Sequence, residues 1–185
     1  MKKLFIAFSI VILAACGDQK TESMKSGTDS ITASTTTMAD VTYPYDISYS
    51  SKFKMAEPKY AQTILTLWKD WDNGDLSAHK DMFADSIEMH FADGSMMHSV
   101  RDSVVAAAQS VRNMFTSAVS SVFTVTSLRS TDKNENWALI WGKEIDKDKN
   151  GKVDSFYLQE TWRFNKDGKT DLLYQYKAAA MPPKQ

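Results

Sequence analysis

Two kinds of apolar pattern follow each other along this sequence, and their order restricts the fold to few classes. Stretches with helix-type spacing come first, and four runs with strand-type alternation come after them. These runs are rich in β-branched and aromatic residues: SVFTVTSL (121–128), NWALIWGKEI (136–145), VDSFYLQETWRF (153–164) and TDLLYQYKA (170–178). This order predicts an α+β domain whose helices cover one face of an antiparallel sheet.

Three helices are predicted before the strand runs. The first lies within EPKYAQTILTLWKDWDNGD (57–75), begins at Pro58 and ends at Asn73-Gly74. Asp75 is suited to cap a short second helix, and Ser99 with Asp102 forms a capping-box pattern before the third. The predicted helix faces carry Tyr60, Ile64, Leu67, Trp68 and Trp71, then Leu76, His79, Met82 and Phe83, then Val100, Val104, Ala108, Val111 and Phe115.

A hairpin is predicted between the second and third helices. In SIEMHF (86–91), Ile87, Met89 and Phe91 alternate onto one side. Asp93-Gly94 is a turn signal, so SMMHS (95–99) is expected to pair back.

The N-terminal segment MKKLFIAFSIVILAAC has the layout of a secretory signal, with two lysines, an apolar run and small residues before Cys16. The apolar run is too short to span a bilayer as a helix. LAAC resembles the lipobox of bacterial lipoproteins, so residues 1–16 are predicted to be a signal peptide that ends at an acylated Cys16. The alternative is a secreted protein with an incidental cysteine.

The rest of the chain divides into a tether and one domain. Residues 17–53 are rich in Ser and Thr and offer little to bury, which predicts a disordered tether. Residues 54–181 are predicted to form a single domain with one core. The expected location is the bacterial cell envelope, where a lipid anchor holds the protein at the membrane.

WDNGDLSAHKDMFAD, the third helix and TWRFNKDGKTDLLYQY together resemble the nuclear transport factor 2-like superfamily, which includes the SnoaL-like cyclases and the ketosteroid isomerases. The resemblance implies a cystatin-like cone, with three N-terminal helices packed on a strongly curved antiparallel sheet. It implies little about activity, because the superfamily uses the cone for isomerases, cyclases, dehydratases and non-catalytic binding modules.

The isomerase motif can be carried over residue by residue. It places the general-base aspartate at Phe91 and the oxyanion-hole tyrosine at Leu67, and neither residue can do that chemistry. The second oxyanion acid falls at Glu160, which alternates in phase with apolar residues of its strand. Glu160 is therefore expected either in the apolar cone or, alternatively, solvated at its mouth.

The predicted function is a membrane-tethered, non-catalytic binding module for a small apolar or amphipathic molecule or for an envelope protein. No cofactor is expected, and the net charge of −1 argues against nucleic acid. A homodimer through the sheet is compatible with this function. The predicted ligand pocket comprises Trp68, Trp71, Met89, Phe91, Leu158, Glu160 and Trp162.

The alternative is a SnoaL-like cyclase, isomerase or hydratase that acts on a hydrophobic ring substrate. Glu160 would be its acid, and a histidine such as His90, beside Glu88, would be its base. The preference for passive binding requires that no second carboxylate or imidazole reaches the cavity beside Glu160.

A further motif, EIDKDKNGKVDSF, places Asp146, Asp148, Asn150 and Asp154 at ligand positions of an EF-hand calcium loop. Strands flank this loop, and the twelfth position holds Tyr157 instead of the bidentate glutamate. A hairpin turn is therefore predicted, with no metal, and weak calcium binding by these four residues is the alternative.

Overall fold

The computed structural model describes residues 42–180. The predicted signal peptide, Cys16 and most of the predicted tether lie outside the described residues. Within residues 42–180, neither helix is long and apolar enough to cross a membrane.

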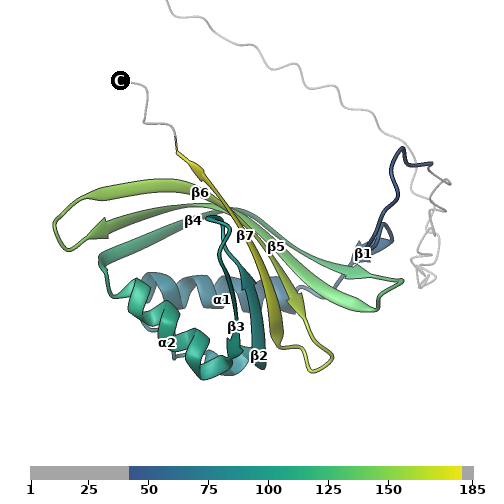
Figure 1. The fold of residues 1–185 in the computed structure, drawn as a ribbon, viewed down its shortest axis with the longest axis horizontal. Coiled ribbons are helices and arrows are strands. Elements are labelled where there is room, and N and C mark those ends of the chain that lie inside the picture. Colours follow the sequence, from purple (N-terminus) through teal and green to yellow (C-terminus); the bar gives the residue numbers. More distant parts are fainter. Residues whose placement is uncertain (1–41, 181–185) are drawn as a thin grey trace, which may run out of the picture. The chain divides into compact units, whose positions relative to one another are not determined.

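The described unit is a mixed α+β fold in which one bent sheet carries two helices on the same face (Figure 1). The seven strands lie in the order β1-β4-β5-β6-β7-β2-β3. The strands are β1 (Phe53–Met55), β2 (Phe83–His90), β3 (Met96–Val100), β4 (Phe115–Ser130), β5 (Glu135–Asp148), β6 (Val153–Phe164) and β7 (Thr170–Ala179), and the helices are α1 (Lys59–Asn73), α2 (Arg101–Arg112) and the short 3-10 helix η1 (Lys80–Met82).

Helix α1 matches the prediction closely. It follows Pro58, which is the N-cap residue, and it buries Tyr60, Ile64 and Trp68 against the sheet. Gly74 ends it with a left-handed φ of 77°, and its N–H donates to the carbonyl of Trp71. The apolar stripe and the predicted Asn73-Gly74 end are therefore both present.

The predicted second helix is wrong. Residues 75–82 form turns and the three-residue η1 instead. Asp75 Oδ1 accepts hydrogen bonds from the N–H and the hydroxyl of Ser77, which closes a local turn. The N–H of Met82 then donates to the carbonyl of His79, three residues back, so the segment continues as 3-10 turns. Residues 42–180 thus contain two α-helices rather than three.

The start and end of the third predicted helix also need correction. Ser99 is paired with Ile87 in β3 and does not cap α2, which begins at Arg101 without a side-chain cap. Phe115 is the first residue of β4. The predicted β2–β3 hairpin is present, with its turn at Asp93 and Gly94.

The sequence predicts an antiparallel sheet, and this is wrong for one pair of neighbouring strands. β2 pairs with β7 in parallel, and every other neighbouring pair is antiparallel. Parallel pairing requires a long crossover, and the chain between β2 and β7 supplies one that contains α2 and three long strands.

Residues on the N-terminal side of residue 54 also pack on the sheet. Phe53 to Met55 form β1, which pairs with the end of β4. Tyr49 packs edge-on against Trp137 with ring centroids 6.0 Å apart. Ser50 donates to Asp132 at 2.6 Å.

Candidate functional site

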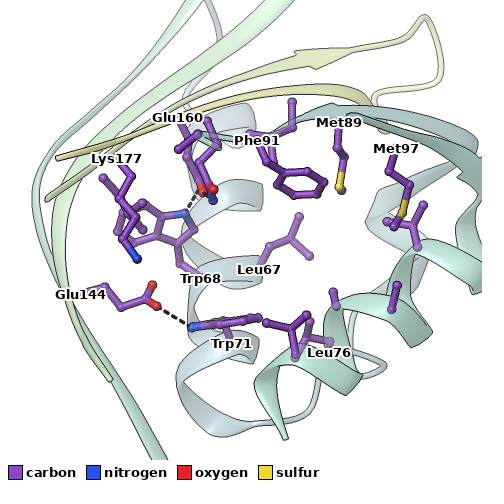
Figure 2. Close-up of a pocket in the computed structure, with 18 of the residues that line it drawn as sticks. Leu67, Trp68, Trp71, Leu76, Met89, Phe91, Met97, Glu144, Glu160 and Lys177 are labelled. Atoms are coloured by element: carbon purple, nitrogen blue, oxygen red, sulfur yellow. Dashed lines mark hydrogen bonds between the residues drawn. The ribbon is translucent and has the colours of Figure 1, made fainter. Parts of the chain in front are cut away.

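A cavity of about 610 Å³ lies between the two helices and the concave face of the sheet. Its wall is mainly apolar, and side chains from α1, α2, β2 and the long strands contribute to it. Figure 2 shows how the labelled residues surround this space. The apolar part of the wall includes Leu67, Leu76, Phe83, Met89, Phe91, Met97, Val104, Val105, Ala108, Phe156, Leu158 and Leu173.

All seven residues of the predicted pocket line this cavity. Trp68 and Trp71 come from α1, Met89 from β2 and Phe91 from the turn after it, and the last three come from alternate positions of β6: Leu158, Glu160 and Trp162. Contact of these residues with a ligand stays a prediction. Phe91 and Leu67, at the two positions of the isomerase motif, both line the wall, so neither an acid nor a hydroxyl occupies them.

Glu160 lies inside the cavity wall rather than at a solvated mouth, and it is 5% exposed. Its Oε2 accepts hydrogen bonds from the indole N–H groups of Trp68, at 2.6 Å, and Trp162, at 2.9 Å. Its Oε1 accepts from the amide of Gln175 at 2.9 Å. Burial raises the pKa of Glu160, and the hydrogen bonds from these three donors oppose that shift.

Four further carboxyl groups line the same cavity. Asp70 and Asp93 hydrogen-bond to His79 and Ser95, and the other two, Glu144 and Asp146, lie on β5. Glu144 and Asp146 are 6% and 4% exposed, respectively. They occupy alternate positions of β5, so both side chains point to the concave face. Glu144 Oε1 accepts a hydrogen bond from the indole N–H of Trp71 at 3.0 Å, which Figure 2 marks.

The carboxyl groups of Glu144 and Asp146 are both buried and affect each other's ionisation. Burial, followed by the neighbouring charge of Asp146, raises the pKa of Glu144 to about 8. Burial also raises the pKa of Asp146, against the opposing effects of Glu144, Lys177 and Arg112. A proton held between such a pair can be given up or taken up near neutral pH.

The condition set for passive binding is therefore not met. A preference for passive binding requires that no second carboxyl reaches the cavity beside Glu160, but Glu144 and Asp146 lie in the same wall. The signal that locates Glu144 is its strand phase, because it continues the inward series of Ala138, Ile140 and Gly142. Its charge and its place beside the EF-hand-like motif favoured a solvated hairpin tip instead.

The two cations that act on Asp146, Lys177 and Arg112, make contacts with other groups. The Lys177 ammonium, in the cavity wall, lies 3.2 Å from the centroid of the Phe156 ring. Arg112 donates to the carbonyls of Trp71 and Asp72 at the end of α1, at 2.6 and 3.1 Å.

The histidines lie elsewhere. His90 is not among the described residues that line the cavity. Its Nε2 lies 2.5 Å from Glu88 Oε1, and its ring stacks on Tyr174. The predicted alternative pair of Glu160 and His90 is therefore not brought together. His79 Nδ1 lies 2.9 Å from Asp70 Oδ1, beside the end of α1.

The four residues of the EF-hand-like motif are divided between the cavity and the turn. Asp146 faces the cavity, whereas Asp148 Oδ1 accepts from the backbone N–H groups of Asn150, at 2.8 Å, and Lys152, at 2.9 Å. Asp154 accepts from the N–H of Ser155. The loop is a hairpin turn between β5 and β6, and residues 42–180 hold no cluster of three or more His, Cys, Asp or Glu suited to a metal.

No model of a protein family matches this sequence, and no curated protein is significantly similar to it. Solved structures do match. A nuclear transport factor 2-like protein of unknown function from Exiguobacterium sp. 255-15 is 17% identical with a TM-score of 0.52, over 63% of this chain and 98% of that one. Another from Burkholderia pseudomallei K96243 is 16% identical with a TM-score of 0.52, over 64% and 90% of the two chains.

A third match is the epoxide hydrolase/cyclase-like enzyme SalBIII, which is 9% identical with a TM-score of 0.51, over 65% of this chain and 91% of that one. Likeness at such low identity concerns the backbone arrangement. The domain described here therefore has the nuclear transport factor 2-like fold.

Proposed function

We propose that this protein is a membrane-tethered module that binds a small, largely apolar molecule in the cavity between its helices and sheet, a function that the carboxyl groups beside Glu160 do not exclude. The observation that carries the proposal is the cavity itself. Its volume of about 610 Å³ falls within the range of pockets that hold small organic ligands. Its wall combines a mainly apolar surface with a few buried polar groups, the composition typical of such pockets.

The tether rests on the sequence. Cys16, at the end of LAAC, is the only cysteine, so an intramolecular disulfide has no second thiol. Acylation of Cys16 would hold the domain at the envelope membrane. Metabolic labelling with an alkyne analogue of palmitate tests this, because label should enter the wild-type chain and not the C16S variant. Equal labelling of both chains would contradict the anchor.

Ligand binding can be measured with N-phenyl-1-naphthylamine, a neutral probe whose fluorescence rises in apolar surroundings. The full-length chain should bind it saturably. Ala108 of α2 lines the cavity and Ala106, on the same helix, is exposed, so A108W and A106W form a matched pair. A108W should fill the cavity and abolish binding, while A106W should bind as the wild type does. Absence of saturable binding, or equal binding by both variants, would refute the proposal.

A second candidate function is acid–base catalysis on a hydrophobic substrate, and the Glu144–Asp146 pair favours it. A carboxyl group whose pKa lies near 8 holds its proton at neutral pH and can act as a general acid. Glu160 suits this role less, because Trp68, Trp162 and Gln175 already occupy its two oxygens. SalBIII, described as epoxide hydrolase/cyclase-like, has a similar fold.

Under this candidate, Glu144 would protonate the substrate oxygen whose bond to carbon breaks. Asp146 would take a proton from the water that attacks that carbon. Styrene oxide is a suitable hydrophobic probe substrate. Its conversion to the diol should be lost in E144Q and retained in E160Q. Lack of turnover by the wild-type chain would leave binding as the function.

A further inference from the structure

The polar end of the cavity carries more carboxyl groups than cationic partners. Glu144, Asp146 and Glu160 all lie there, and all are buried. None of the ion pairs formed within residues 42–180 involves any of the three. Buried carboxylates are normally paired, so an unpaired set is unusual.

The three groups are not equally satisfied. Glu160 accepts three hydrogen bonds, and Glu144 accepts one from Trp71. Asp146 Oδ1 is completely buried and has no hydrogen-bond partner within residues 42–180, and the Asp146 carboxyl as a whole interacts with that of Glu144. A buried acceptor left in this state is unfavourable, so a ligand that donates to the Asp146 carboxyl would be favoured.

The lysine in this part of the wall does not satisfy the pair. Lys177 makes a cation–π contact with Phe156 and no ion pair with a described residue. Its charge does act on Asp146 from a distance and lowers the pKa of that carboxyl, against the effect of burial.

We propose that the cavity selects ligands that carry a protonated amine on an apolar body, and that the carboxyl groups of Glu144 and Asp146 bind the amine. This inference rests on the proposed binding function and specifies the class of ligand. An ammonium group supplies both a positive charge and several N–H donors. One N–H would donate to the Asp146 carboxyl, and another to the side of the Glu144 carboxyl group that Trp71 leaves free.

The shape of the cavity gives the amine a direction. In Figure 2, Glu144 and Lys177 lie at one end, at the left, while Met89 and Met97 lie at the other. Leu67, between these ends in the same view, belongs to the apolar wall. An amine bound at the acid pair would therefore extend its apolar body toward the methionines, whose flexible side chains adapt to different shapes.

The test uses two probes with one body, 4-phenylbutylamine and 4-phenylbutan-1-ol. Each displaces N-phenyl-1-naphthylamine from the full-length chain at pH 7.5, where the amine is a cation. The amine should compete about tenfold more strongly than the alcohol, because a buried charge pair contributes at least that factor. Equal competition by the two would overturn the inference while leaving the binding function intact.

Variants separate the acid pair from the rest of the cavity. The double variant E144Q/D146N removes both acid groups with little change in shape, so the amine and the alcohol should compete equally for it. D154N is the control, because Asp154 lies in the same hairpin but is exposed and outside the cavity wall. It should keep the preference.

K177M provides an independent readout, since removal of a nearby positive charge should strengthen binding of the amine severalfold relative to binding of the alcohol. An amine preference that survives in E144Q/D146N, or that falls in K177M, refutes the inference. Failure of the neutral probe to bind the wild-type chain would remove the binding function, and the inference with it.

Discussion

Glu160 connects three elements of the domain, so replacement by leucine should destabilise it strongly. The side chain accepts from Trp68 of α1, Trp162 of β6 and Gln175 of β7. In E160L all three donors lose their acceptor, and each buried unsatisfied donor costs about 1–3 kcal/mol. Removal of the buried carboxyl offsets part of this, which leaves an expected loss of about 3–6 kcal/mol from a typical total of about 5–15.

E160Q should behave very differently, which makes it the matched control. The glutamine carbonyl can occupy the place of Oε2 and accept from both indoles. The glutamine NH₂ would then face Gln175, whose amide can rotate and accept from it. With every hydrogen bond kept, E160Q should remain within about 1 kcal/mol of the wild type at pH 7.

The difference in stability between E160Q and the wild type should also depend on pH. Burial raises the pKa of Glu160 above its ordinary value of 4.5, so the folded chain holds this proton more tightly than the unfolded chain does. The stability that this proton contributes is complete below pH 4.5 and is lost as pH rises through the folded pKa. E160Q cannot lose a proton there, so its stability relative to the wild type should increase with pH.

Urea unfolding of the full-length chain between pH 5 and pH 8.5 can be followed by tryptophan fluorescence and circular dichroism. It measures the stability of E160L, the stability of E160Q, and how the difference between E160Q and the wild type changes with pH. The reasoning fails if E160L is as stable as the wild type. It also fails if E160Q is as unstable as E160L, or if the difference between E160Q and the wild type stays constant with pH.

Three further predictions concern single side chains. A Cβ on Gly142 would lie 2.7 Å from the Ser121 carbonyl oxygen and 2.7 Å from the Trp68 ring, so G142A should cost about 1–3 kcal/mol in a thermal melt, and an unchanged melt would contradict this packing. E144Q should gain stability over the wild type as pH rises from 5 to 9, because the folded chain keeps the Glu144 proton up to about pH 8; a flat difference in urea unfolding would contradict the raised pKa. D148A should cost about 1 kcal/mol and speed amide exchange at the β5–β6 turn, since two N–H groups lose their acceptor; unchanged exchange would show that other contacts hold the turn.

Local sequence patterns are sufficient to predict which side of a helix or strand is buried when only one of its faces is buried. The spacing of Tyr60, Ile64 and Trp68 predicted the buried side of α1, and the alternation of β6 predicted that Glu160 faces inward. Both patterns follow from the geometry of a single helix or strand, so no knowledge of partners is needed.

Other features depend on partners that are distant in the sequence. The parallel pairing of β2 with β7 joins segments about eighty residues apart, and no local pattern encodes it. β5 continues inward through Glu144 and Asp146 because β4 and β6 are long enough to pair with it there. The charges of that segment resemble a solvated turn, which is why the acid pair was not predicted as part of the cavity wall.

The position of β7 has a consequence for how the chain reaches its native state. β7 is the last strand in sequence but lies between β6 and β2, so it alone joins the β2–β3 hairpin to the remaining strands. During synthesis, β2 and β3 must wait until nearly the whole domain has left the ribosome before they gain this neighbour. A chain cut short before Thr170 would expose the edges of both β6 and β2, and unpaired edges of this kind promote aggregation.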